Sequence, residues 1–281
     1  MILITGANGQ LGTELRYLLD ERDEDYVATD VSQLDITDAD QVDKVFSEVK
    51  PTLVFHCAAY TAVDKAEDEG KALDYAINVT GTENIAKATA THGATLVYIS
   101  SDYVFDGEKT VGETWSEDEQ TNPQTEYGRT KVIAEQKIQE TLKHFYLIRT
   151  SWLFGKYGKN FVSTMLDLAD KKEKIEVVND QHGCPTWSRT LAEFILYLIE
   201  FEKPFGIYHL SNLGPTTWYG FAKEILKNKP VEIIPVNSEA FLQKAKRPKN
   251  SVLSLRKAQS VGFNIPTWQD ALKEMLKQVR K

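Results

Sequence analysis

The chain opens with a short apolar strand pattern that runs directly into a glycine-rich turn. The run Ile2–Thr5 is followed by Gly6-Ala7-Asn8-Gly9-Gln10-Leu11-Gly12, and an amphipathic helix pattern begins inside this turn. Glycines permit the tight connection, let the backbone approach a pyrophosphate and let the helix pack closely on the strand. The positive helix N-terminus then faces the anion. The unit therefore predicts dinucleotide binding, with Gly6, Asn8, Gly9, Gln10, Leu11 and Gly12 against the cofactor.

The same alternation of strands and helices continues to about residue 150. Further strand-like runs are Tyr26–Asp30, Leu53–Cys57, Leu96–Ser100 and Tyr146–Arg149. Helix patterns cover Leu11–Leu19, Asp40–Glu48, Ala72–Thr91 and Tyr127–Leu142. The strands are almost wholly apolar, which is typical of strands buried on both faces of a parallel sheet. We therefore expect an α/β protein with a Rossmann-like, doubly wound parallel sheet.

The second half of the chain is more irregular, because seven of its residues between 185 and 266 are prolines. We expect the strand-like run Ile175–Val178 and the apolar helix Ser188–Glu200 to return to the sheet. The dinucleotide-binding domain would then comprise residues 1–151 plus about 175–202. A smaller C-terminal substrate-binding lobe would comprise about 152–174 plus 203–281.

Composition and charge exclude several classes of protein. The 281 residues include 33 Lys and Arg against 41 Asp and Glu, a net charge of -8, with no basic cluster. Nucleic acid and anionic membranes are therefore not expected partners. The longest apolar stretch, 194–199, is too short to span a bilayer. Two cysteines outside any CxxC motif and the lack of a signal peptide favour the cytoplasm. The five histidines show no metal-binding spacing, so no metal site is predicted.

An acidic residue ends the second predicted strand. Asp30 lies 18 residues beyond Gly12, where a carboxylate accepts hydrogen bonds from the adenosine ribose and repels a 2′-phosphate. Positions 7, 8, 31 and 32 carry no Arg or Lys that would bind that phosphate. These observations favour NADH over NADPH. The alternative reading of Asp30 is a polar turn residue.

Two polar segments provide candidate catalytic groups. Tyr127 and Lys131 are four residues apart, on one face of a predicted helix. A nearby ammonium, joined by an oxidised nicotinamide, lowers the pKa of a phenol, so the pair can act as a general acid. Ser101 follows the fourth strand and could donate a hydrogen bond to a substrate carbonyl. Such a pair is also common on protein surfaces, and Ser101 could simply end its strand.

With these features in this order, the sequence resembles the dTDP-4-dehydrorhamnose reductases of the extended short-chain dehydrogenase/reductase superfamily. The matching segments extend over nearly the whole chain, and SSDYVFDG and RTSWLFG are the more specific of them. They are GANGQLG (6–12), LDIT (34–37), HCAAYTAVDKAE (56–67), SSDYVFDG (100–107), YGRTK (127–131), RTSWLFG (149–155), DQHGCPT (180–186) and Arg247-Pro248.

The resemblance implies reduction of the 4-keto group of dTDP-4-dehydro-L-rhamnose to dTDP-L-rhamnose by NADH or NADPH, a step of nucleotide-sugar and polysaccharide biosynthesis. Tyr127 would be the proton donor and Lys131 its partner on the nicotinamide ribose. Further cofactor contacts would come from Asp30, Asp35, Ile36, Ala58, Ala59 and Tyr60. Substrate contacts would come from Ser101, Asp102, Tyr103, Trp152, Asn160 and Arg247. The family often has Thr where this chain has Ser101, and Ser keeps the hydroxyl.

Some members of that family bind a divalent ion through carboxylates at a dimer contact. Glu14 could match one such position, but the last helix offers Gln278 where a second acid would be needed. Mg²⁺ is thus possible but unsupported, and both a monomer and a homodimer remain open.

Two other functions fit the same fold. The first is a nucleotide-sugar epimerase or dehydratase that recycles its NAD⁺, but dehydratases need an acid pair, and Asp102 is followed by Tyr103. The second is a non-catalytic regulatory subunit, because the subfamily also resembles the regulatory subunit of a methionine adenosyltransferase. The complete set of Ser101, Tyr127 and Lys131 favours an enzyme.

Overall fold

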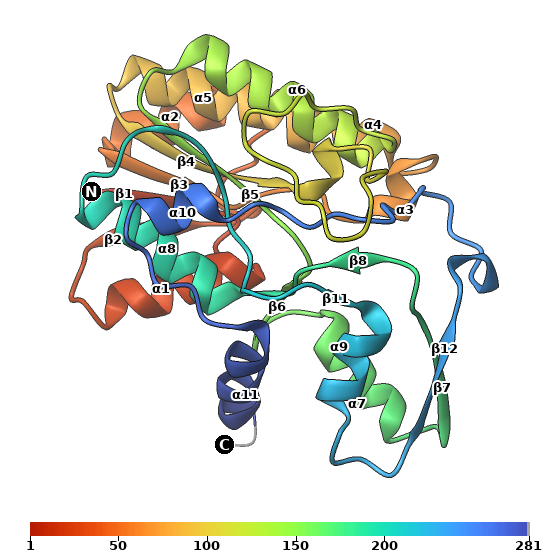
Figure 1. Ribbon diagram of the computed structural model, residues 1–281. Helices are drawn as coiled ribbons and strands as arrows, with labels where there is room; N and C mark the ends of the chain where they lie inside the picture. Colours follow the sequence, from red (N-terminus) through yellow and green to blue (C-terminus); the bar gives the residue numbers. More distant parts are fainter. Residues whose placement is uncertain (280–281) are drawn as a thin grey trace.

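The computed structural model describes residues 1–279 and is built around a six-stranded parallel sheet (Figure 1). The strand order is β10-β5-β4-β3-β1-β2, and every pairing between neighbours is parallel. The bounds are β1 Ile2–Thr5, β2 Tyr26–Thr29, β3 Leu53–His56, β4 Thr95–Ser101, β5 Phe145–Thr150 and β10 Gly206–His209. The chain passes from β1 to β2 at one edge and then crosses back to β3 on the other side of β1, so a crevice forms beyond the carboxyl ends of β1 and β3.

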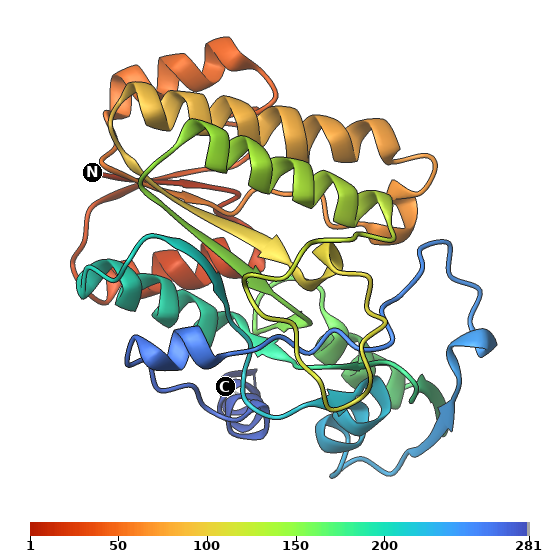
Figure 2. The same ribbon diagram turned by 45° about the horizontal axis from the view of Figure 1, so that its top comes forward.

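Helices cover both faces of this sheet (Figures 1 and 2). One face carries α2 (Ala39–Val49), α5 (Thr82–Thr91) and α6 (Glu126–Thr141), and the other carries α1 (Gln10–Asp20) and α8 (Ser188–Glu200). Each layer encloses its own apolar core against the strands, which explains why the strand sequences are apolar on both sides. The expected α/β class, the doubly wound sheet and the helix at 188–200 are confirmed.

A smaller group of elements packs beside the carboxyl edge of the sheet. It contains α7 (Phe161–Ala169), α9 (Trp218–Ile225), α11 (Trp268–Val279) and a parallel pair formed by β7 (Lys174–Val178) and β12 (Glu232–Val236). These elements share a third apolar core, in which Phe221 of α9 stacks on Phe161 of α7 and packs edge-on against Trp268 of α11. In Figure 1, α7, α9, β7 and β12 lie at the lower right, and α11 lies at the bottom nearer the middle.

The expectation that Ile175–Val178 returns to the central sheet is wrong. This run forms most of β7, which pairs with β12, and the sixth strand of the central sheet is β10. The side chains of Lys174 and Glu176 are exposed on alternate positions of β7. A strand in the middle of a doubly covered sheet would have to bury both charges, which is unfavourable. β10 is only four residues long and follows Pro204 closely, so its strand signal is weak.

The remaining elements are short. They are α3 Val63–Ala66, α4 Lys71–Tyr75, the π-helix η1 Ala76–Gly81, the 3-10 helices η2 Asp102–Val104 and η3 Ser238–Ala240, β6 Leu153–Phe154, β8 His182–Gly183, β9 Thr186–Trp187, β11 Thr216–Thr217 and α10 Arg256–Ser260. The single helix expected over Ala72–Thr91 is thus α4, η1 and α5 in succession. None of the helices within residues 1–279 combines the length and apolarity that a membrane crossing requires.

Candidate active site

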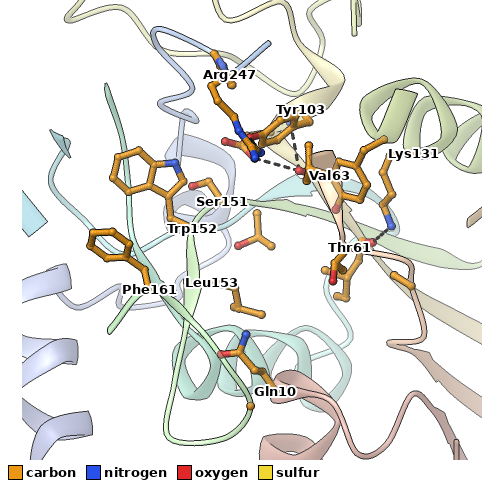
Figure 3. Close-up of a pocket in the computed structure, with 18 of the residues that line it drawn as sticks. Gln10, Thr61, Val63, Tyr103, Lys131, Ser151, Trp152, Leu153, Phe161 and Arg247 are labelled. Carbon is orange, nitrogen blue, oxygen red and sulfur yellow. Dashed lines mark hydrogen bonds between the residues drawn. The ribbon is translucent and has the colours of Figure 1, made fainter. Parts of the chain in front are cut away.

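A cavity of about 850 Å³ opens at the carboxyl ends of the central strands. Its walls come from the glycine turn, the segments after β3, β4 and β5, helix α6, and the C-terminal group of elements. Figure 3 shows Gln10 and Arg247 at opposite ends of this cavity, with Lys131 on one wall and Trp152 and Phe161 on the other. A cavity of this size matches those that hold small-molecule ligands.

The glycine turn forms one end of the cavity, as predicted, with Gly6, Gly9, Gln10, Leu11 and Gly12 in its lining. Gly6 has φ +64°, and a Cβ atom there would lie 2.6 Å from the Ala58 nitrogen. A Cβ on Gly12 would meet the Gly6 carbonyl oxygen. Gly9 is the N-cap of α1, and no side chain caps the helix there. The turn therefore leaves backbone N–H groups and free space for a pyrophosphate, which fits a dinucleotide.

Asp30 lies against this turn. Its carboxylate accepts a hydrogen bond from the Asn8 backbone N–H at 3.1 Å and another from the Val31 N–H at 2.8 Å. Asp35 accepts from the Thr37 N–H at 2.9 Å, and Ile36 is buried beneath Gly81 of η1. The structure therefore brings Asp30 to the glycine turn, whereas Ile36 is part of the packing between the following turn and η1.

The segment after β3 is held by polar residues that the sequence did not reveal. Asn78 of η1 accepts from the Tyr60 N–H at 2.9 Å and donates to the Tyr60 carbonyl oxygen at 3.0 Å. It also donates to buried Asp74 at 2.6 Å, and Thr130 of α6 donates to the same carboxylate at 3.0 Å. This network joins the segment that contains Ala58, Ala59 and Tyr60 to the helix that contains Tyr127. Ala59 lines the cavity. No sequence motif pointed to Asn78 or Asp74.

The three predicted catalytic residues meet in the cavity. Tyr127 and Lys131 lie in the first two turns of α6, which begins where the Thr125 hydroxyl accepts from the Gly128 N–H at 3.0 Å. Ser101 is the last residue of β4, and all three side chains line the cavity. The Lys131 ammonium donates to the Ile99 carbonyl oxygen at 2.7 Å. Helix capping and strand register thus place the hydroxyl, the phenol and the ammonium together.

The pKa values of this pair differ from the sequence-based expectation. Burial raises the pKa of Tyr127 above its usual value, and the Ser101 hydroxyl only partly opposes this rise. Burial also lowers the pKa of Lys131 to about 7. The pKa of the phenol is therefore raised in this structure, whereas the sequence analysis expected Lys131 and an oxidised nicotinamide together to lower it. Loss of hydration outweighs the charge, and the ammonium is directed at the Ile99 carbonyl.

Asp102 provides a buried carboxylate in the wall of the cavity. Its Oδ1 accepts from the Ser101 hydroxyl at 3.0 Å, while its Oδ2 is buried and has no hydrogen-bond partner within residues 1–279. Burial raises the pKa of Asp102 to about 6. A buried polar atom without a partner is costly unless a ligand satisfies it. Asp102 thus places a buried carboxylate beside Ser101, and its Oδ2 atom is covered by protein close to Ser251.

The opposite end of the cavity is built from distant segments. Arg247 lies beside Tyr103 (Figure 3) and donates to its hydroxyl oxygen at 2.7 Å. Arg247 also pairs with Asp64. Trp152 has φ +47°, and its ring stacks on Trp218 with 3.6 Å between the ring centroids. The aromatic residues Trp218, Phe161 and Phe241 also line the cavity, and the sequence analysis missed them. The only sequence signal for these three residues is that they are aromatic. Aromatic residues in an irregular region usually belong to an apolar core, so this signal does not indicate a binding site.

Asn160 is used differently from the expectation. Its side chain accepts from the Ser163 N–H at 3.2 Å as the N-cap of α7, and it donates to the Gly155 carbonyl oxygen at 2.8 Å. It also donates to the Gln10 side chain at 3.2 Å. Asn160 therefore fixes the turn before α7 and holds Gln10 in the wall of the cavity.

The surroundings of Glu14 do not fit a divalent ion. Glu14 is buried, accepts from Ser188 at 3.4 Å and lies 3.9 Å from the guanidinium of Arg189. The same guanidinium pairs with Glu21 and Glu193. The positive charge beside these three carboxylates is therefore already provided by Arg189. No cluster of three or more His, Cys, Asp or Glu side chains suited to a metal occurs within residues 1–279.

Comparisons with known proteins agree with this site. The family model described as RmlD substrate binding domain matches residues 1–281. A dTDP-4-dehydrorhamnose reductase of Streptomyces griseus is 41% identical over 97% of this chain and 91% of its own length. The spore coat polysaccharide biosynthesis protein SpsK of Bacillus subtilis is 40% identical over 99% and 97%.

A solved structure extends the similarity to three dimensions. The crystal structure of dTDP-4-dehydrorhamnose reductase from Bacillus anthracis in complex with NADP has a TM-score of 0.94 and 41% identity, and covers 99% of this chain and 98% of its own. The match therefore includes both the sheet and the elements beside it. On the evidence of sequence, fold and cavity together, the chain belongs to the dTDP-4-dehydrorhamnose reductase family.

Proposed function

We propose that this protein reduces the 4-keto group of dTDP-4-dehydro-L-rhamnose to dTDP-L-rhamnose, as a monomer or homodimer in the cytoplasm. One observation carries the proposal: a single cavity contains Ser101, Tyr127 and Lys131 between the glycine turn and Arg247. The glycine turn supports binding of a nicotinamide dinucleotide at one end. The other end then receives the sugar and its diphosphate.

Each catalytic side chain has a distinct part in the reaction. A reduced nicotinamide supplies the hydride for the sugar carbon. Tyr127 keeps its proton at neutral pH, because burial raises the pKa of its phenol, and it donates that proton to the carbonyl oxygen. The Ser101 hydroxyl, which donates to Asp102 in the structure, would turn its hydrogen to the same oxygen and stabilise its developing charge. Lys131 would bind the nicotinamide ribose through its amino group, close to Tyr127.

The remaining wall residues position the sugar nucleotide. Asp102 lines the cavity and accepts from Ser101 through Oδ1, so it positions the Ser101 hydroxyl beside the sugar. Arg247 reaches the cavity beside Tyr103, and a guanidinium binds phosphate oxygens through two parallel hydrogen bonds. Trp152 lines the cavity, and because Trp218 covers one face of its ring, a sugar ring would contact the rest of the indole.

The two lobes divide these tasks. We assign cofactor binding to the sheet with its two helical layers, and substrate binding mainly to the group of α7, α9, α11, β7 and β12. Asp30 beside the glycine turn favours NADH, since its carboxylate accepts from a ribose hydroxyl and repels a 2′-phosphate.

The test is the loss of NADH absorbance with enzymatically prepared dTDP-4-keto-6-deoxy-L-hexose, followed by identification of the sugar product. We expect dTDP-L-rhamnose and released NAD⁺. Tyr127→Phe should reduce turnover by about 10³-fold while NADH still binds. A folded protein that binds NADH without turnover would contradict the proposal. Tightly bound NAD⁺ that copurifies and is recycled would instead indicate an epimerase or dehydratase.

A further inference from the structure

A buried ion pair lies directly behind the side chains of the proposed reaction. Glu135 of α6 accepts two parallel hydrogen bonds from Arg149 of β5, from Nη2 to Oε2 at 2.7 Å and from Nε to Oε1 at 3.0 Å. Neither side chain is more than 4% exposed. The hydroxyl of Ser100 on β4 donates to the same carboxylate. One carboxylate therefore connects the helix to two adjacent strands of the central sheet.

On the helix side, the carboxylate is in line with the two catalytic residues of α6. Tyr127, Lys131 and Glu135 follow one another at intervals of four residues, so their side chains lie on one face of the helix. Lys131 and Glu135 are each only 2% exposed. A shift or rotation of α6 would move all three side chains together, and the two bonds between Glu135 and Arg149 oppose such a movement.

On the strand side, the carboxylate holds the end of β4. Ser100 directly precedes Ser101, which lines the cavity. Ser100 also directly follows Ile99, whose carbonyl oxygen accepts from the Lys131 ammonium at 2.7 Å. Successive side chains of a strand point to opposite faces, so Ser100 is directed at Glu135 when Ser101 is directed at the cavity. The hydrogen bond from Ser100 therefore fixes both of its neighbours relative to α6.

Stability alone does not explain why such a pair is buried here. Removing two charges from water is unfavourable, and well-packed apolar side chains in place of a buried ion pair are often equally stable. The pair does have a fixed geometry, because the third guanidinium nitrogen, Nη1 of Arg149, also donates to the Glu117 carbonyl oxygen at 3.3 Å. A bidentate pair with further hydrogen bonds holds its partners in one arrangement.

We infer that Glu135 is a positioning residue for the proposed reaction: through Ser100 and Arg149 it sets the place of the Ser101 hydroxyl relative to the Tyr127 phenol. This inference rests on the proposed function, in which both groups are directed at one carbonyl oxygen. Within residues 1–279 the cavity lining does not include Glu135, so it acts through its neighbours. A displacement of about 1 Å at a reacting group can lower a rate by about 10²-fold.

The test is the single-turnover rate of NADH oxidation with excess enzyme over the dTDP-keto sugar, combined with fluorescence titration of NADH. Ser100→Ala removes the bond between β4 and Glu135 and leaves the ion pair in place. The rate should fall at least about tenfold, because the two groups no longer meet the carbonyl oxygen together. The Kd for NADH should change less than about twofold.

A second variant tests whether both side chains act through the same contact. Glu135→Gln should also lower the single-turnover rate, and the double variant with Ser100→Ala should be no slower than Glu135→Gln alone. Thr89→Val is the control for Ser100→Ala, since it removes a buried hydroxyl that bonds only within α5. Glu140→Gln is the control for Glu135→Gln, because Glu140 is an exposed acid of α6. Both controls should keep the parent rate.

Three outcomes in an active parent protein would overturn this inference alone. A parent rate in Ser100→Ala would mean that the network serves folding only, even where the free energy of unfolding falls. An equal loss of rate and NADH affinity would mean that the whole cavity has changed shape. Additive losses in the double variant would mean that the two side chains act separately. A parent protein that does not reduce the sugar would overturn the proposed reaction and the inference with it.

Discussion

The two ends of the cavity are built in different ways. The end with the glycine turn consists mainly of backbone at the ends of adjacent parallel strands, where a Cβ on Gly6 or Gly12 has no room. The end with Arg247 consists of side chains from segments near residues 103, 152, 161, 218 and 247, tied by two-residue strands and single ion pairs. Substitutions should therefore affect folding at the first end and substrate affinity at the second.

The largest effect should come from the backbone end. Gly6→Ala should lower the free energy of unfolding by about 3–5 kcal/mol and abolish cofactor binding. The alanine would have to adopt a left-handed backbone conformation, and its Cβ would also clash with the backbone at Ala58. Gly93 has the same φ of +64° but nothing within 4 Å of its Cβ position. Gly93→Ala should therefore cost only about 1 kcal/mol. Urea denaturation of both variants measures the difference, and equal losses would show that crowding at Gly6 is unimportant.

The next effect concerns the side-chain end. Arg247→Gln should raise the KM for the dTDP-sugar by about 10–100-fold, as expected when a charged hydrogen bond to a phosphate is lost. Its NADH affinity and its free energy of unfolding should stay close to those of the parent. Lys246→Gln removes an adjacent, exposed cation that pairs with Glu108, and serves as the control. An unchanged KM, or an equal loss of NADH affinity, would contradict the assignment of Arg247 to the substrate.

A third prediction concerns Asp102, which lies in the cavity wall between the two ends. It uses the pH dependence of the free energy of unfolding. The pKa of Asp102 is about 6 in the folded protein and about 3.9 in an unfolded chain. The folded state therefore binds more protons between these values, so this group lowers stability as pH rises from about 4 to 6. Asp102→Asn should raise the free energy of unfolding by about 2 kcal/mol at pH 7.5. The gain should disappear near pH 4.

The control for that experiment is Asp43→Asn, an exposed position on α2. It should change the free energy of unfolding by less than about 0.5 kcal/mol at both pH values. A pH-independent gain in Asp102→Asn would indicate a packing effect and would contradict the proposed titration.

The smallest effect should follow removal of divalent ions. EDTA should change neither the rate of reduction nor the thermal midpoint, because Arg189 already places a cation beside Glu14. The measurement is turnover with EDTA, with added Mg²⁺ and with neither. Activity that is lost in EDTA and restored by Mg²⁺ would show that a metal binds at other ligands.

Much of the end with the glycine turn could be predicted from local sequence. The spacing of Gly6, Gly9 and Gly12 required a turn between strand and helix, and Tyr127 and Lys131 were placed on one helical face by their spacing alone. The prediction that Ile175–Val178 joins the central sheet was wrong, because a strand pattern does not specify the partner strand. In the structure β7 pairs with β12. Asn78, Asp74 and Trp218 were missed, because their roles depend on neighbours distant in the chain.

The sequence by itself determined the parallel sheet, the glycine turn and the chemical groups of the reaction, because these depend on periodicity and on contacts within a few residues. Only the tertiary structure decided which polar atoms are buried, and hence the direction of the pKa shifts at Tyr127, Lys131 and Asp102. It also decided that Arg149 meets Glu135, Arg189 meets Glu14 and Arg247 meets Tyr103. Desolvation and long-range contacts arise from packing, which no local pattern encodes.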